Sequence, residues 1–207
     1  MGDTKEGNKI SCHCGKCSFS LNQRKAVRSL LCGCEDCRQA LEWGSTLGGK
    51  KPTGIERAVY VKSDISTVSG KESMRVVMLR ENAKSTRIHC ENCGAIIGID
   101  HIGYSDNVFM FFPRHCNTDC DVSISPSAAI YLDDASEDAI ASLPEEIPKI
   151  FNHSKNPEEK KLLYSLGPHK ETFSPPKTAA KGKTIREVIS SIGNVEVLNL
   201  EKGATIV

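Results

Sequence analysis

The sequence contains no apolar run that approaches the roughly 20 residues of a membrane-spanning helix, so we expect no membrane partner. Its charges nearly cancel, because 27 Lys and Arg face 26 Asp and Glu for a net charge of +1. A net charge this close to zero produces no strong electrostatic field, which argues against nucleic acid as a partner. The first ten residues are polar and mixed in charge, unlike a secretory signal or an Arg-rich transit peptide. We therefore expect a cytoplasmic location, with the nucleus as the alternative.

The chain also lacks the signs of a disulfide framework, although it contains ten cysteines. Nothing in the sequence argues for secretion, where disulfides are common. Many of the cysteines are separated by only one or two residues, which is a poor spacing for local disulfides. The same spacing suits several thiolates that turn inward on one ion. We therefore interpret the cysteines as metal ligands.

Three short motifs carry most of these cysteines. They are "CHCGKC" at residues 12–17, "CGCEDC" at residues 32–37 and "CENCG" at residues 90–94. The Gly at the end of the third motif lets the backbone turn and direct its amides at the sulfurs. Two such groups followed by a third pair are a strong signal for zinc.

A ligand count divides the motifs between two sites. A closed structural zinc site needs four ligands, so Cys90 and Cys93 require two partners. Cys12 and Cys14 fit best, because Cys17 shares an alternating face with apolar neighbours and is expected to be a buried, inert thiol. This count predicts a structural ion held by the two pairs.

The remaining group, Cys32, Cys34 and Cys37, has no fourth thiol or imidazole close by in the sequence. Three protein ligands and one open position are typical of a catalytic zinc site. In the alternative, Cys17 or a histidine closes the site and both ions are structural. The histidines considered for this role are His13, His89 and His115.

The segments around the motifs predict a mainly β fold, a mixed antiparallel β domain organised around two zinc sites with a partly helical C-terminal extension. Short segments rich in Val, Ile and Phe, separated by turn residues, predict strands. One short helix is expected at residues 37–43. The predicted strands are residues 17–21, 26–31, 57–62, 74–79, 85–90, 95–100 and 107–112.

We divide the chain into five parts by composition. Residues 1–9 are an N-terminal tail, 10–134 the zinc-binding domain, 135–166 an acidic and partly helical extension, 167–183 a linker, and 184–207 a helix and strand segment. Thr184 is the expected N-cap of that last helix. The C-terminal tail either packs on the domain or docks a protein partner.

The three cysteine motifs, with Arg38 directly after the second and "YLDD" at residues 131–134, resemble the glutathione-dependent formaldehyde-activating enzyme family, which includes centromere protein V-like proteins. The resemblance spans residues 10–134. It implies two zinc ions per chain: a structural ion on Cys12, Cys14, Cys90 and Cys93, and a catalytic ion on Cys32, Cys34 and Cys37.

The resemblance further implies a carbon–sulfur lyase that joins a small thiol such as glutathione to formaldehyde, as an S-hydroxymethylglutathione synthase does. Arg38 is the candidate substrate-binding residue. The alternative is a non-catalytic zinc-stabilised interaction module of the centromere protein V type, with redox sensing as a third interpretation. Cys116 and Cys120 are additional thiols that we interpret as incidental, although a third soft metal site or a redox pair would also fit their spacing.

Overall fold

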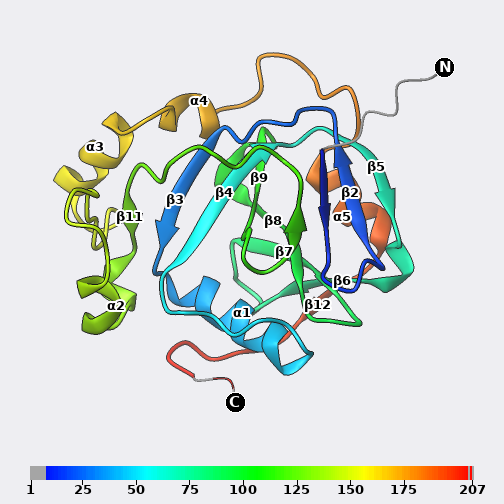
Figure 1. Cartoon of the computed structure of the whole chain (residues 1–207), viewed down its shortest axis with the longest axis horizontal. Coiled ribbons are helices and arrows are strands. Elements are labelled where there is room, and N and C mark those ends of the chain that lie inside the picture. Colours follow the sequence, from blue (N-terminus) through cyan, green and yellow to red (C-terminus); the bar gives the residue numbers. More distant parts are fainter. Residues whose placement is uncertain (1–7, 205, 207) are drawn as a thin grey trace.

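Two β-sheets form the centre of the fold in this computed structural model, which describes residues 8–204 and residue 206. The eight-stranded sheet has the order β11-β3-β4-β9-β8-β7-β6-β12, and the four-stranded sheet has the order β10-β1-β2-β5 (Figure 1). Of the expected N-terminal tail, residues 1–7 lie outside the described residues. The strands are β1 Lys9–Ser11, β2 Ser18–Leu21, β3 Arg28–Cys32, β4 Glu56–Lys62, β5 Ile65–Ser69, β6 Met74–Met78, β7 Ser85–Cys90, β8 Ile96–His101, β9 Val108–Phe111, β10 Asn117–Thr118, β11 Ala129–Ile130 and β12 Val195–Val197.

The mainly β prediction is confirmed, and each predicted strand segment coincides with one of β2, β3, β4, β6, β7, β8 and β9. Most neighbouring strands pair antiparallel, as expected. The two edge pairs, β11 with β3 and β12 with β6, are parallel instead. Both edge strands belong to segments that return to the sheet from far along the chain, so a hairpin does not dictate their direction.

The strands of the large sheet are almost continuously apolar because both faces of the sheet are buried. Side chains alternate between the two faces of a strand. Along β9, Phe109 and Phe111 belong to one core cluster, whereas Val108 and Met110 belong to the other. All four are at most 3% exposed. The large sheet is therefore a central layer that needs a cover on each side.

One face is covered by the four-stranded sheet and α5 (Ile185–Ile192), and the other by α1 (Glu35–Thr46) and the C-terminal extension (Figure 1). In the extension, α2 (Glu137–Ala141) is followed by α3 (Pro157–Ser165) and α4 (His169–Phe173). Leu163 of α3 and Phe173 of α4 pack into the core on the α1 side. Single 3-10 turns occur at Lys71–Ser73, Ile102–Tyr104 and Leu132–Asp134.

The helix termini follow local capping rules. Thr184 and Glu187 form a capping box at the start of α5, so the predicted N-cap is confirmed. Asn156 caps α3 with its side chain, and Pro157 occupies the first turn, where a missing N–H costs little. The helix expected at residues 37–43 extends over Glu35–Thr46, and the expected linker at residues 167–183 contains α4.

The described part of the C-terminal tail packs against the domain. After β12, the N–H groups of Leu198 and Leu200 donate to the carbonyl oxygens of Met78 and Leu79 at 2.9 and 2.8 Å. The Gln39 side chain of α1 then donates to backbone carbonyls at residues 201 and 204. Of the two interpretations of the tail, the structure therefore has the packed one.

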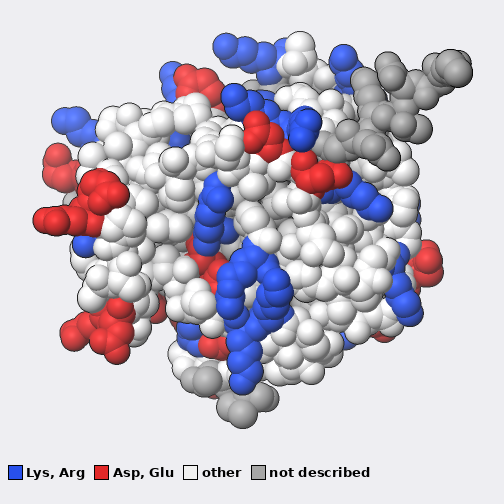
Figure 2. Space-filling model, viewed as in Figure 1, with Lys and Arg blue, Asp and Glu red and all other residues white. Residues whose placement is uncertain are grey.

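The surface carries both signs of charge. Figure 2 shows Lys and Arg interspersed with Asp and Glu on this face, with acidic side chains gathered on the side where α2 and α3 lie. Within residues 8–204 and 206, no helix combines the length and the apolar character needed to cross a membrane.

Gly44 of α1 and Gly94 of the β7–β8 turn approach each other closely through their backbones. Gly94 has a φ of +62°, and a Cβ built on it would lie 1.9 Å from the Gly44 carbonyl oxygen. A Cβ on Gly44 would in turn lie 2.5 Å from the Gly94 oxygen. Because both backbones touch, only glycine fits at either position.

We predict that Gly94→Ala destabilises the zinc-loaded protein more than Gly15→Ala does. Gly15 has a similar φ of +75°, but nothing lies within 4 Å of a Cβ placed there, so its substitution costs only the left-handed backbone, about 1–2 kcal/mol. Gly94→Ala adds a steric overlap of about 1–3 kcal/mol. Denaturant unfolding of the two variants measures the difference, and equal free energies of unfolding would contradict the contact.

Candidate metal centre

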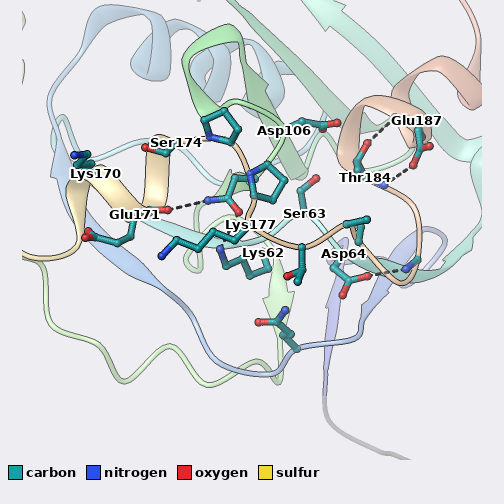
Figure 3. Close-up of a pocket in the computed structure, with 18 residues that line it drawn as sticks. Lys62, Ser63, Asp64, Asp106, Lys170, Glu171, Ser174, Lys177, Thr184 and Glu187 are labelled. Carbon is teal, nitrogen blue, oxygen red and sulfur yellow. Dashed lines mark hydrogen bonds between the residues drawn. The ribbon is translucent and has the colours of Figure 1, made fainter.

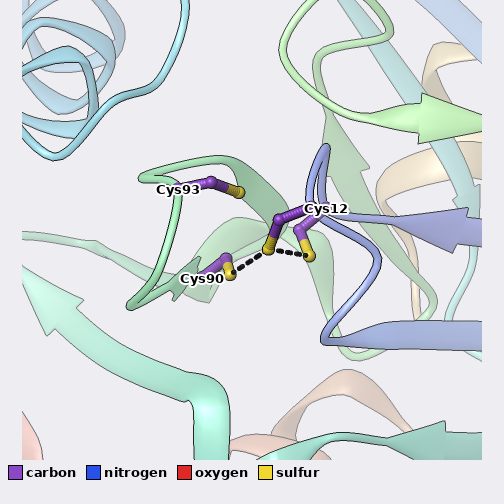
Figure 4. A group of neighbouring side chains, drawn as sticks. Cys12, Cys90 and Cys93 are labelled. Carbon is purple, nitrogen blue, oxygen red and sulfur yellow. Dashed lines mark hydrogen bonds between the residues drawn. The ribbon is translucent and has the colours of Figure 1, made fainter.

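Four cysteines from two separate turns form the first thiol group (Figure 4). Cys12 and Cys14 lie in the β1–β2 turn, and Cys90 and Cys93 lie at the β7–β8 turn. Their four sulfur atoms lie within 4.8 Å of one another. The Cys14 sulfur is 3.5 Å from that of Cys12 and 3.6 Å from that of Cys90.

Backbone amides in this turn favour ionised sulfur. Burial disfavours the thiolate of Cys12, but the Cys17 N–H, which donates to the Cys12 sulfur at 3.3 Å, helps to lower the pKa of Cys12. Burial raises the pKa of Cys17 itself, and Cys17 lies outside the group. Cys17 is thus a buried thiol, as the sequence predicts.

The second thiol group lies where β3 turns into α1. Cys32 ends β3, Cys34 is the N-cap of α1, and Cys37 lies in the first turn of that helix. The Cys34 sulfur accepts the Cys37 N–H at 3.4 Å, and the sulfurs of Cys32 and Cys37 are 3.7 Å apart. The positive end of the helix dipole therefore faces three sulfur atoms.

Both groups have the donor spacing that a metal ion requires. Zn–S bonds of ~2.3 Å in a tetrahedron place neighbouring sulfurs ~3.8 Å apart, close to the separations in both groups. All ten cysteines are free thiols. The side-chain hydrogen bond with Cys34, together with burial, raises the pKa of Cys32 well above the ordinary value, and the one with Cys32, together with burial, does the same to the pKa of Cys37. A cation is what would allow these crowded thiols to ionise together, so the residues present fit a metal.

The histidines that could have closed the second site lie elsewhere. The His13 Nδ1 is 3.3 Å from the Asn117 side-chain oxygen, and the His115 Nε2 is 3.2 Å from a Glu56 carboxylate oxygen. His89 is fully buried, and burial lowers its pKa to about 3. Among the described residues, the second group has three members, all of them cysteines.

Arg38, Cys116 and Cys120 lie apart from both groups. The Arg38 guanidinium pairs with Glu42 on α1 at 2.7 Å, and Arg38 is absent from the described residues that line the cavity beside the thiols. Its role in substrate binding stays a prediction. Cys116 and Cys120 are both buried, with exposed fractions of 3% and 6%.

The three-thiol group opens onto a cavity of about 750 Å³, with all three cysteines in its wall. The central sheet supplies part of the apolar lining, which includes Leu30, Tyr60 and Met110. The cavity is large enough for a small organic molecule. A small molecule in this cavity would therefore meet the three-thiol group.

Basic side chains line the cavity beside the thiols, together with the carboxylates of Glu35, Asp36 and Asp134. Arg87 is 1% exposed, and among the described residues its guanidinium donates only to the carbonyl oxygens of Ser85 and Asp36, both at 3.3 Å. Its positive charge also acts to lower the pKa of Cys37. Lys84 and Lys202 line the same cavity. These groups could bind an anionic substituent of a substrate.

Tyr131 approaches the thiols on a strained backbone. It has a φ of +56°, which is uncommon for a bulky residue, and it lines the cavity. Its ring lies 4.6 Å from that of His153. Burial, followed by the charges of the three cysteines, raises the pKa of Tyr131, so the phenol is a neutral donor.

Part of the cavity wall comes from the C-terminal extension and α4, and no sequence pattern predicts it. Its members are His153, Leu163, Tyr164, His169 and Phe173. The Asn-Pro pair at residues 156–157 could have predicted the start of α3. No local sequence pattern indicates that these side chains line the same cavity as the cysteines.

A second cavity of about 810 Å³ lies at the β4–β5 turn and the segment before α5, and Figure 3 shows its lining. Its polar groups largely pair with each other. Asp64 accepts from the Asn22 side chain and the Gly182 N–H, and Lys62 donates to Asn107. Its lining, within the described residues, contains no cysteine or histidine. Although slightly larger, this cavity does not resemble a metal or catalytic site.

The fold and both thiol groups define a mixed β protein with two cysteine clusters suited to metal binding. The chain belongs to the glutathione-dependent formaldehyde-activating enzyme family, whose model matches residues 8–134, more than half of the 207 residues. A comparison with curated proteins finds no match. The match ends at Asp134, so the extension that closes the cavity lies outside it.

We predict that Cys34→Ser loses about one of two bound zinc ions and that Cys93→Ser loses one or both, with different effects on folding. Cys34→Ser should stay folded, because it alters a group at a cavity wall. Cys93→Ser should unfold or be strongly destabilised, because its group joins two turns and the metal contributes directly to folding. Metal analysis with circular dichroism measures both effects.

Cys120→Ala is the matched control, since it removes a buried thiol outside both groups. It should keep both zinc ions. Retention of two ions by Cys34→Ser would contradict a metal site at the β3–α1 turn.

Proposed function

We propose that the chain is a zinc-dependent carbon–sulfur lyase or adduct-forming enzyme that acts on a small thiol such as glutathione. The observation that supports it is the three-thiol group in the wall of a cavity. In this proposal Cys32, Cys34 and Cys37 hold the catalytic zinc. Cys12, Cys14, Cys90 and Cys93 hold the structural zinc.

The reaction joins a thiol and a carbonyl compound. The sulfur forms a bond to the carbonyl carbon, the electron pair of the C=O π bond moves to oxygen, and the proton lost from sulfur ends on that oxygen. Reversal breaks the same C–S bond. Zinc, when bound, would supply the positive charge that keeps a substrate sulfur ionised.

The chain's own groups orient the reactants and provide the proton. Arg87 and Lys84, together with Lys202 from the C-terminal tail, fit the carboxylates of glutathione because they line the cavity beside the thiols. Tyr131 is the proposed proton donor to the developing alkoxide, and its phenol regains the proton that the thiol releases to water. It lines the cavity with the three cysteines, and its phenol is neutral.

The direct test is the exchange rate between glutathione, formaldehyde and S-hydroxymethylglutathione, because this addition also occurs without a catalyst. NMR exchange spectroscopy on the equilibrium mixture should show faster exchange with the zinc-loaded protein and unchanged equilibrium concentrations. Cys34→Ser should abolish the acceleration, whereas Cys120→Ala should retain it. No acceleration by the wild-type protein, with this thiol or with other small thiols, would favour the non-catalytic interaction module.

We also predict that Tyr131→Phe lowers the protein-catalysed exchange rate at least about tenfold, the lower end of the loss expected for a general acid. The ring and its packing against His153 remain, so zinc content and unfolding should match the wild type. An unchanged exchange rate in this variant would assign the proton to another group.

A further inference from the structure

The cavity beside the three-thiol group has two chemically different halves. The charged lining residues come from the family-matched domain and the C-terminal tail. Another part of the lining comes from residues 135–173, the extension together with α4, which contribute the rings of His153, Tyr164, His169 and Phe173. The domain forms one part of the cavity lining, and the extension with α4 adds a wall of aromatic side chains.

The rings of this wall form a continuous chain. Phe173 meets Tyr60 edge-on at 5.2 Å and stacks on Tyr104 at 5.5 Å. His169 lies 4.8 Å from Phe173 and stacks on Tyr164 at 4.3 Å. An aromatic surface therefore extends from the central sheet to α3, where Tyr164 is 53% exposed.

These rings are not ordinary core side chains. The phenylalanines of the domain core, such as Phe109, Phe111 and Phe112, are 0% exposed. Phe173, Tyr104 and Tyr131, by contrast, are only half-buried and line the cavity. The part of each ring that lines the cavity remains available for a ligand.

The two histidines of the wall are uncharged at neutral pH. Burial lowers the pKa of His169 to about 4 and also lowers that of His153. A polar group placed against these rings would lose water and gain few hydrogen bonds, whereas an apolar or aromatic group would gain contact area.

A cationic ligand does not suit the same surface. The Arg28 guanidinium already lies over Phe173, 5.8 Å from the ring centre. Arg28 is 1% exposed, and its side-chain nitrogens have no hydrogen-bond partner among the described residues. This uncompensated charge behind the wall would repel a second cation.

We propose that the extension selects a substrate with an aromatic group close to the reacting sulfur, bound against the wall formed by Phe173, Tyr164 and His169. This inference rests on the proposed function and deepens it. The aromatic group comes either from the thiol or from a carbonyl compound larger than formaldehyde. Both sources place a ring next to the new C–S bond.

Two matched probe pairs distinguish these sources in calorimetric titrations of the zinc-loaded full chain. S-benzylglutathione against S-methylglutathione represents a ring that comes from the carbonyl compound. Benzyl mercaptan against ethanethiol represents a ring that comes from the thiol. We expect the benzyl member of at least one pair to bind roughly tenfold tighter or more, from the added burial of a ring.

Two variants locate the preference on the wall, and a third is the control. Phe173→Ala and Tyr164→Ala should reduce the benzyl preference to about threefold or less. Because Tyr164 is largely exposed, its variant should fold even where Phe173→Ala does not. Phe151→Ala removes a 40% exposed ring of the extension outside the cavity lining and should keep the preference.

The outcomes separate this inference from the proposed function. Equal binding within both pairs, or a preference that all three variants retain, overturns the aromatic selection. The lyase proposal survives that result if thiols bind and exchange is accelerated. If no thiol or thioether binds, both proposals fail.

Discussion

The position of α1 between the two thiol groups is the constraint on which the site depends. The N-terminal turn of the helix carries Cys34 and Cys37, so its direction sets where three sulfurs meet. Near its other end, Gly44 touches Gly94, one residue after Cys93 of the four-thiol group. Trp43 adds an edge-on contact with buried His89, their ring centres 4.7 Å apart. A metal that organises the four-thiol turn would therefore also fix the helix that carries the other three thiols.

The central sheet makes this arrangement possible because both of its faces are covered. The face toward the four-stranded sheet is packed with large, buried apolar side chains. The face toward α1 is covered only in part by that helix, and the extension covers the rest. A cavity remains where these two covers meet over β3, beside Cys32 at its end. The cavity beside the three-thiol group is therefore a gap between two helical covers rather than a groove in the sheet.

The thiol groups and most central strands could be predicted from the sequence because each depends on local spacing. Cysteines one to three residues apart must share a turn, and alternation of Val, Ile and Phe predicts strands. The cavity wall could not be predicted in this way. Phe173 meets Tyr60 and Tyr104 across long stretches of chain, and residues 167–183 have the composition of a linker although α4 begins there. The φ of Tyr131 likewise follows from packing against the sheet and the extension, since its residue type disfavours it.

The domain and the extension supply different parts of the cavity, the thiols and the aromatic rings respectively. Addition of a thiol to formaldehyde proceeds readily without an enzyme, so the thiol chemistry alone offers limited advantage. Every thiol of the two groups lies within the family-matched residues 8–134, whereas the extension supplies none of them. The extension, together with α4, instead contributes rings to the wall of the cavity and no member of either thiol group. Because fold and metal geometry can serve several substrates, a change confined to that wall alters selectivity while the reaction is kept.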